Sequence, residues 1–158
     1  MALPTSTAAT LACDTLIALP GSAAPALATI YAKNADRPSF EWQPLAVNPR
    51  KRQPIGSTVR SVSGLEVPQA PTTAATIGQG PSWSWGYSHG VNEHGVAMGN
   101  EYWPTRSRTA DAGAGPKLVF PELVRLTLAR CRNTSAAVEV LGQLVGRHGQ
   151  GPCATGAR

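Results

Sequence analysis

The sequence predicts an α+β fold in which short antiparallel strands come first and two helices follow. Three observations indicate this order. Short apolar runs, several of them rich in β-branched residues, occupy the first two-thirds of the chain, and clear helical periodicity begins only near residue 120. The 16 glycines and 14 prolines indicate many turns. Strands followed by helices are typical of α+β or layered folds, and 158 residues suffice for one domain with a core.

A β-hairpin is expected near the N-terminus. Residues 15–19 (TLIAL) and 26–34 (ALATIYAKN) are strand-like and flank the turn-rich segment PGSAAP. If the turn centres near residue 23, positions whose numbers sum to about 46 lie opposite each other. Cys13 then faces the neighbourhood of Lys33, and Asp36 lies just beyond. A slip of one or two residues leaves them close, so the pattern predicts proximity and not a contact.

The middle of the chain predicts further strands. Residues 38–58 hold four prolines and a basic cluster, which indicates an extended segment at 45–47 and then a surface loop. Residues 59–67 alternate and predict one strand, and 72–78 predict another more weakly. Residues 83–103 are expected to form a second hairpin around Asn92-Glu93-His94-Gly95, with Gly95 at positive φ. After that turn one strand face should carry Val96, Met98, Asn100 and Tyr102.

The last third predicts two amphipathic helices that pack together and onto a sheet. Pro121 suits a first helical position, Thr134 can cap the second helix, and Gly149 is a natural stop. Helical spacing in the first helix joins Phe120, Leu123, Val124, Thr127, Leu128 and Cys131. In the second it joins Ala137, Val138, Leu141, Leu144 and Val145.

Composition and charge exclude several classes of protein. The net charge is +5, but the basic residues are scattered over a loop, a connector and a helix, which argues against nucleic-acid binding. No apolar run approaches the roughly 18 residues of a membrane span. The cysteines are Cys13, Cys131 and Cys153, with no CxxC pair. They predict neither a disulfide framework nor zinc, and they favour a reducing, cytoplasmic setting without a cofactor. His89 and His94 lack a third metal ligand.

Cys13 is the sharpest candidate for chemistry. It stands directly before a strand, and small residues precede it. If residues 1–12 are a propeptide that is removed, Cys13 carries both a thiol and a free α-amine. An α-amine has a reference pKa of about 7.7–8.0 and can act as a general base near neutral pH. A base within the nucleophilic residue would generate the reactive thiolate. The alternative is a small buried hydrophobic residue, as most lone cysteines are.

Several motifs, in order, resemble those of secernin-like cysteine dipeptidases. The first two are ACDTLIALP (12–20) and YAKNADRP (31–38), followed by LEVPQAP (65–71) and WSWGYSHGVNEHGVAMGNE (83–101). ELVRLTLARC (122–131) and AAVEVLGQLVGRHGQG (136–151) are similar to the two helices of that family. KNADRP and NEHGVAMGNE are the most specific, and the resemblance covers nearly all of the chain from residue 12.

The resemblance implies an N-terminal-nucleophile hydrolase fold, with stacked antiparallel sheets flanked by helices, that cleaves the amide bond of a dipeptide or similar small substrate. Residues 13–158 would form the N-terminal part of that domain, apparently incomplete because family members are much longer. Cys13 corresponds to the nucleophile, Asp36 to the residue that orients its amine, and Asn100 to an oxyanion-hole donor. Lys33 stands where a related branch has arginine, and with Asn92 it is assigned to substrate binding.

Each of these residues also has a purely structural interpretation, and two other functions are alternatives to a dipeptidase. Asp36 suits a turn or a surface pair, Asn100 a strand end, and Asn92 a turn. A non-enzymatic interaction protein related to secernins, with a role in secretion, is the main alternative to a dipeptidase, and an acylase acting on non-peptide amides is a third. We expect uncovered strand edges in the isolated chain, which favour self-association into oligomers, and weak or no activity without the family's further strands.

Overall fold

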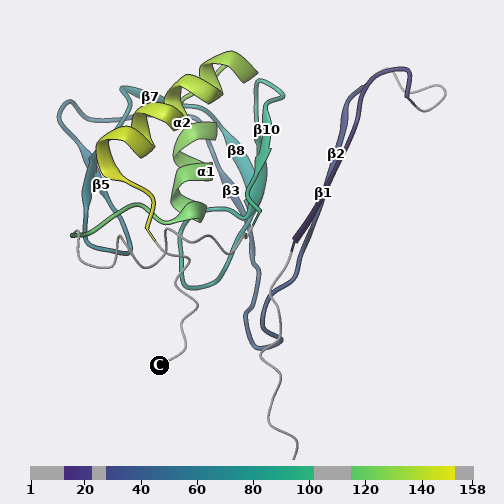
Figure 1. Cartoon of the computed structure of the whole chain (residues 1–158). Helices are drawn as coiled ribbons and strands as arrows, with labels where there is room; N and C mark the ends of the chain where they lie inside the picture. The colour runs from purple at the N-terminus through teal and green to yellow at the C-terminus, as the bar shows by residue number, and fades with distance from the viewer. Residues whose placement is uncertain (1–12, 23–27, 102–114, 152–158) are drawn as a thin grey trace, which may run out of the picture.

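A computed structural model describes residues 13–22, 28–101 and 115–151. These residues form an α+β structure of several small antiparallel sheets followed by two C-terminal helices (Figure 1). The predicted order, strands first and helices last, is confirmed. The proposed propeptide, residues 1–12, lies outside the described residues, as do Tyr102 and Cys153.

The predicted N-terminal hairpin is present. Strand β1 (Cys13–Ala18) pairs antiparallel with β2 (Ile30–Ala35), and Figure 1 shows the pair as a long arm beside the β10 edge of the sheet. Cys13 lies opposite Ala35, so paired positions sum to 48 rather than the expected 46. The shift of two residues lies within the slip that was allowed for, so the expected proximity of Cys13 to Lys33 is confirmed. An even shift leaves the same side chains on the same face.

The main sheet has four strands in the order β10-β9-β8-β3. Its members are β3 (Leu45–Asn48), β8 (Thr76–Gln79), β9 (His89–Asn92) and β10 (Ala97–Gly99). The extended segment expected at 45–47 is thus confirmed as β3. The expected turn is also confirmed, because Gly95 has a φ of 76° and donates its N–H to the Asn92 carbonyl at 3.0 Å. The expected strand before this turn begins only at His89.

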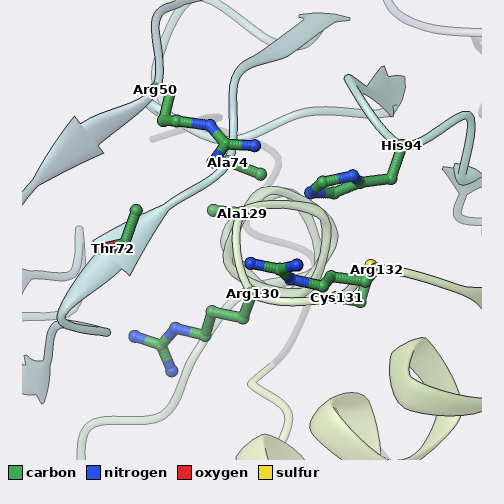
Figure 2. A pocket seen from close by; sticks show the side chains of 8 residues that line it. All are labelled: Arg50, Thr72, Ala74, His94, Ala129, Arg130, Cys131 and Arg132. Carbon is green, nitrogen blue, oxygen red and sulfur yellow. The ribbon is translucent and has the colours of Figure 1, made fainter.

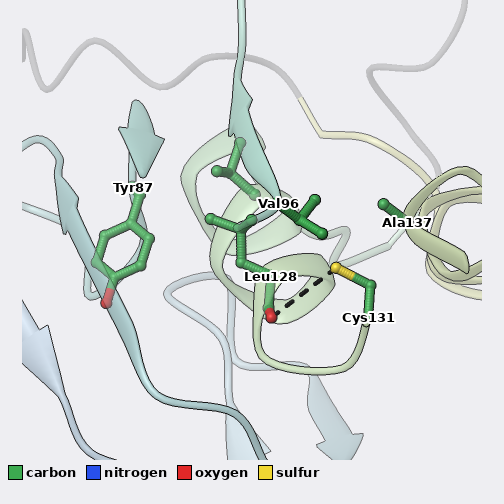
Figure 3. Packing of buried hydrophobic residues seen from close by; sticks show 6 residues of the cluster. Tyr87, Val96, Leu128, Cys131 and Ala137 are labelled. Carbon is green, nitrogen blue, oxygen red and sulfur yellow. Dashed lines mark hydrogen bonds between the residues drawn. The ribbon is translucent and has the colours of Figure 1, made fainter. Parts of the chain in front are cut away.

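One face of this sheet packs on helix α1 (Phe120–Leu128). The core there joins strand, turn and helix residues, which Figure 3 shows around Leu128. Tyr87 is fully buried, and its ring lies so close to Gly78 that a Cβ there would come within 2.5 Å of it. The fully or nearly buried members are Tyr87, Val96, Val124, Leu128, Cys131 and Ala137. Met98 packs against them from the same strand face as Val96, as expected.

The opposite face of the sheet is apolar and largely exposed. Val47, Ile77 and Val91 lie in one row across β3, β8 and β9, and Leu45 lies beside them. Val47 is 71% exposed and Leu45 68% exposed. The hairpin is similar, with Leu16 and Ile17 about three-fifths exposed. Such exposed apolar strand surface favours association with other chains.

The strands predicted at 59–67 and 72–78 are wrong in their bounds, because these segments contribute to two small two-stranded sheets. Residues 58–68 form a hairpin of β5 (Thr58–Arg60) and β6 (Glu66–Pro68), not one strand. Gly64, at a φ of 88°, makes the turn that the alternating pattern concealed. The second segment divides between β8 and β7 (Thr72–Thr73), and β7 pairs with β4 (Lys51–Arg52).

Both predicted helices are present. In α1, Pro121 lies in the first turn, and buried Glu122 accepts hydrogen bonds from the backbone N–H groups of Val119 at 3.1 Å and Val62 at 2.7 Å. Burial raises the pKa of Glu122, and these two bonds oppose that rise. Glu122 therefore ties the start of α1 to the β5–β6 turn.

Helix α2 (Thr134–His148) differs from the expectation at two positions. Asn133, not Thr134, is the cap, and its Oδ1 accepts from the Ala136 N–H at 2.8 Å. Val138 is 69% exposed and so does not belong to the buried stripe. Gly149 ends the helix at a φ of 67°, as predicted. Leu144 packs with Leu123, Leu126, Leu118 and Val67 in a second core cluster. Neither α1 nor α2 has the length and apolar character needed to cross a bilayer, within the parts of the chain described.

Candidate functional site

Cys13 is the first residue of β1, and its thiol is free and half-buried. The register places it opposite Ala35, the last residue of β2, so Asp36 follows immediately after its partner. The predicted proximity of residues 13 and 36 is confirmed at the level of the backbone. No hydrogen bond between the side chains of Cys13 and Asp36 is found in the described structure.

The odd-numbered residues of both strands share one face of the hairpin, since residues directly opposite each other project to the same side. Thr15 lies opposite Lys33 on this face, next to Cys13. The Thr15 hydroxyl donates to Glu101 Oε1, and Lys33 Nζ lies 3.2 Å from the same oxygen. The Lys33 side chain is fully buried, whereas Glu101 is 40% exposed. One carboxylate after β10 thus joins the two strands of the hairpin to the main sheet.

Tyr31, further along the same face of the hairpin, also contacts the main sheet. Its hydroxyl lies against Gly99, where a Cβ would come within 1.9 Å of the phenol oxygen. The same Cβ would lie 3.2 Å from His89 Cβ, since His89 and Gly99 are partners across β9 and β10. Only glycine leaves room for Tyr31 at this place. Burial, and then the nearby charge of Lys33, lower the pKa of His89.

Two buried polar atoms at this junction, the Tyr31 hydroxyl and His89 Nδ1, have no hydrogen-bond partner among the described residues. Asn100 Oδ1, one residue after Gly99, is also buried and unpaired. Buried polar atoms are nearly always paired in folded proteins, so unpaired ones call for an explanation. A bound substrate, ordered water or another protein segment would satisfy them.

Asn100 directly follows β10 and precedes Glu101. Its backbone N–H donates to the Ser88 carbonyl at 3.0 Å, which fixes the chain at the end of the strand. Strand alternation puts its side chain on the face opposite Glu101. The structure records no contact between Asn100 and Cys13, so the two residues share a region of the fold and not a hydrogen bond.

Arg37, the residue after Asp36, has a clear structural role. Its Nε and Nη2 atoms donate to the two oxygens of Glu41 at 2.8 and 2.7 Å, and both side chains are only 5% exposed. Burial raises the pKa of Glu41, but hydrogen bonds from Arg37, Trp83 and Gln43 outweigh it and hold that pKa below its ordinary value. This pair fixes the chain as it leaves β2.

The side-chain amide of Asn92 is hydrogen-bonded within the turn and to the chain at the end of α1. Its Oδ1 accepts from the N–H groups of His94 and Val96, each at 3.0 Å. Its Nδ2 donates to the carbonyls of Leu128 at 2.9 Å and Cys131 at 2.8 Å. It is 4% exposed. The turn role is confirmed, and no polar atom of the side chain remains for the expected role in substrate binding.

Cys131 offers a useful contrast with Cys13. It is 1% exposed, and its Sγ lies 3.9 Å from the Leu128 carbonyl. Figure 3 marks this contact with a dashed line. Burial raises the pKa of its thiol. A buried thiol with a raised pKa is a poor nucleophile, so Cys131 is a core residue.

Sequence reasoning missed Tyr31, His89 and Glu101. Alternation along the second hairpin could have placed Glu101 on the face opposite Asn100, and alternation along β2 puts Tyr31 on the same face as Lys33. Nothing local indicates that these two faces meet. The described residues contain no group of three histidine, cysteine, aspartate or glutamate side chains that could hold a metal ion. A comparison with models of known protein families finds no match.

Proposed function

We propose that this protein is a cysteine-type hydrolase of the N-terminal-nucleophile class that cleaves the amide bond of dipeptides or similarly small substrates, with Cys13 as the attacking residue. One observation carries the proposal. A half-buried free thiol begins a strand on the same hairpin face as Lys33, Glu101 anchors that face to the sheet, and the unpaired Tyr31 hydroxyl and His89 Nδ1 lie buried at the junction. The resemblance to secernin-like dipeptidases supports the same residue.

The chemistry begins once residues 1–12 are removed. The α-amine of Cys13 takes the thiol proton, and the thiolate attacks the substrate carbonyl carbon. The tetrahedral intermediate collapses, the C–N bond breaks, and the ammonium of Cys13 returns its proton to the leaving amine. Water then attacks the thioester, with the amine again accepting a proton. The acid is released and the thiol is restored.

Neighbouring residues have supporting roles in this proposal. Asp36, next to the partner of Cys13, would hold the α-amine by a charge-assisted hydrogen bond. Asn100 would supply a donor to the oxyanion; loss of one such donor typically costs about 2.7–4 kcal/mol of barrier. Lys33, buried on the same hairpin face as Cys13 and paired with Glu101, would contribute to substrate binding. Asn92 is left out because its amide is occupied.

Intact mass analysis of the purified protein, paired with a dipeptide hydrolysis assay, tests the proposal. We expect a mature chain that begins at Cys13 and an activity that Cys13→Ser abolishes. Cys131→Ala is the matched control, since it removes a thiol from the core, and it should keep the activity. A chain that retains Met1 or Ala2, with hydrolysis unchanged in Cys13→Ser, would remove the basis of the proposal.

The exposed apolar surface supports a second candidate, a non-enzymatic interaction protein. Leu16, Ile17 and Ile30 on the hairpin are each at least half exposed. A retained N-terminus together with a stable complex lost on Ile17→Ser would favour this function. An acylase acting on non-peptide amides would use the same site and would be separated by its substrate range.

A further inference from the structure

A pocket lies on the helix side of the sheet, away from Cys13. It has a volume of about 310 Å³ and is bounded by the end of β3, the β7–β8 segment, β5 and α1. This is near the lower limit for pockets that hold small organic ligands. Its wall combines the apolar groups of Val59, Leu126 and Trp85 with the amides of Asn48, Gln53 and Gln69.

The guanidinium of Arg125, a residue in the last turn of α1, also lines this pocket. Its Nη1 donates to the Trp85 carbonyl, and its Nη2 donates to Asn48 Oδ1 at 2.6 Å. Its central carbon lies 5.3 Å from the centre of the Trp85 ring and 5.6 Å from that of Tyr87. These contacts hold the guanidinium in a fixed orientation, and both acceptors are neutral.

Arg125 makes no ion pair with a carboxylate among the described residues. Burial of its guanidinium lowers its pKa. Arginine stays charged in proteins, and here two aromatic rings and two neutral acceptors, not a counterion, face the partly buried guanidinium. The residues that line the pocket include no aspartate or glutamate. An anion that entered would meet one fixed cation and no opposing charge.

A smaller neighbouring depression increases the positive charge. It shares Ala74 and Ala129 with the first pocket and is lined by Arg50, Arg130, Arg132 and His94. Figure 2 shows Arg50, His94 and Arg132 gathered around the end of α1. The helix dipole accounts for cations at this C-terminal end, and Arg50 already pairs with Glu93 at 2.9 Å. Arg125, in the last turn of α1, shares this favourable dipole, but unlike Arg50 it has no carboxylate partner among the described residues.

We infer that the pocket at Arg125 binds a small organic carboxylate whose charged group pairs with the guanidinium and whose body contacts the Trp85 ring and the amides of Gln53 and Gln69. Arginine binds carboxylates through two parallel N–H bonds, and its Nε and second Nη hydrogens are not used by Trp85 and Asn48. The mixed apolar and amide wall fits a short acylated amino acid better than a bare inorganic ion. This site is independent of the function proposed for Cys13.

An NMR titration of the full chain tests the inference, with the indole N–H of Trp85 as the reporter. The probes are N-acetylglycine, its neutral amide and inorganic phosphate. We expect a saturable shift of the Trp85 signal with N-acetylglycine only. Equal shifts with the carboxylate and the neutral amide, or no shift at Trp85 with the carboxylate, would overturn the inference. A third outcome would also overturn the inference: phosphate shifts the His94 signal, and none of the three probes shifts the Trp85 signal. That result would place the anion in the neighbouring depression.

Variants then separate binding from folding. Arg125→Gln should weaken N-acetylglycine about tenfold or more, because a charged hydrogen-bond partner is lost. Ala74→Leu fills the pocket and leaves Arg125 in place, so it should also abolish the shift even if Arg125→Gln fails to fold. Arg147→Gln, on the exposed part of α2, is the matched control and should bind as the wild type does. Unchanged binding in Ala74→Leu contradicts the assignment.

Discussion

Lys33 and Glu101 are 68 residues apart in the sequence, yet Lys33 Nζ lies 3.2 Å from Glu101 Oε1. The ion pair joins the N-terminal hairpin to the end of β10. Cys13, Thr15 and Lys33 share one face of the hairpin, and the ion pair holds this face to the main sheet. The candidate site therefore depends on this contact between two hairpins that are distant in the chain.

Removal of the lysine should loosen the hairpin. Lys33→Met leaves Glu101 without its cation, but Glu101 is partly exposed and regains water, so we expect a cost of about 1 kcal/mol. Amide hydrogen exchange in β1 and β2 should accelerate roughly fivefold, with little change in α1. Lys51→Met on the exposed strand β4 serves as the control. Equal exchange rates in the wild type and Lys33→Met would show that the ion pair does not hold the hairpin.

We expect Asn92 to contribute to the stability of the fold. Asn92→Ala removes five hydrogen bonds at a buried position, one of them a weak bond to Cys131 Sγ, and deprives the Leu128 and Cys131 carbonyls of their amide donor. We expect a loss of about 3 kcal/mol in the free energy of unfolding, measured with urea. Asn34→Ala, at an exposed position of β2, should change it by less than about 0.5 kcal/mol. A neutral effect of Asn92→Ala would return this side chain to consideration for substrate binding.

Local patterns predicted much of the fold. Alternation gave the first hairpin, the turn residues gave Asn92–Gly95, and helical spacing gave α1 and α2. The errors also have local causes. Ser63-Gly64 is a tight turn within an otherwise alternating run, so one expected strand became β5 and β6. The hairpin register differs by two from the expected one because paired positions sum to 48 and not 46, and this moves each pair by the same amount.

The site was less predictable than the fold. Cys13 and Asp36 come together through one hairpin, which sequence can indicate. The contacts of Glu101 with Lys33 and of Gly99 with Tyr31 join separate hairpins, and no periodicity encodes which faces meet. Asn133 rather than Thr134 caps α2, which is a one-residue choice between two good cap residues.

The two described cysteines should differ in reactivity. With Cys153→Ser as background, iodoacetamide should modify half-buried Cys13 in the folded protein and leave Cys131 unmodified, because Cys131 is 1% exposed and burial raises its pKa. Peptide mapping by mass spectrometry gives the rates, and we expect a ratio on the order of a hundred or more. Both thiols should react equally in urea. Faster modification of Cys131 than of Cys13 in the native protein would be incompatible with the packing around α1.

His89 should make stability depend on pH. Burial and the charge of Lys33 hold its pKa below the unfolded value of about 6.5, so the unfolded chain binds a proton more readily. The contribution is fully present above about pH 6.5 and is lost as the pH falls towards the folded pKa. Urea midpoints at about pH 7.5 and about pH 5 measure it. His89→Gln should reduce the difference between these midpoints. An unchanged difference in this variant would exclude His89 as a source of the pH dependence.

The most direct test of the account compares dipeptide hydrolysis by two forms of the protein, one that begins at Cys13 and one that keeps Ala12 before it. The second form has the same thiol and the same fold, but its Cys13 nitrogen is an amide and cannot accept a proton. Because general base catalysis typically contributes about 10²–10⁴-fold, we predict that the additional residue lowers the rate at least about a hundredfold. Equal, Cys13-dependent rates in both forms would contradict the claim that the nucleophile and its base belong to one residue.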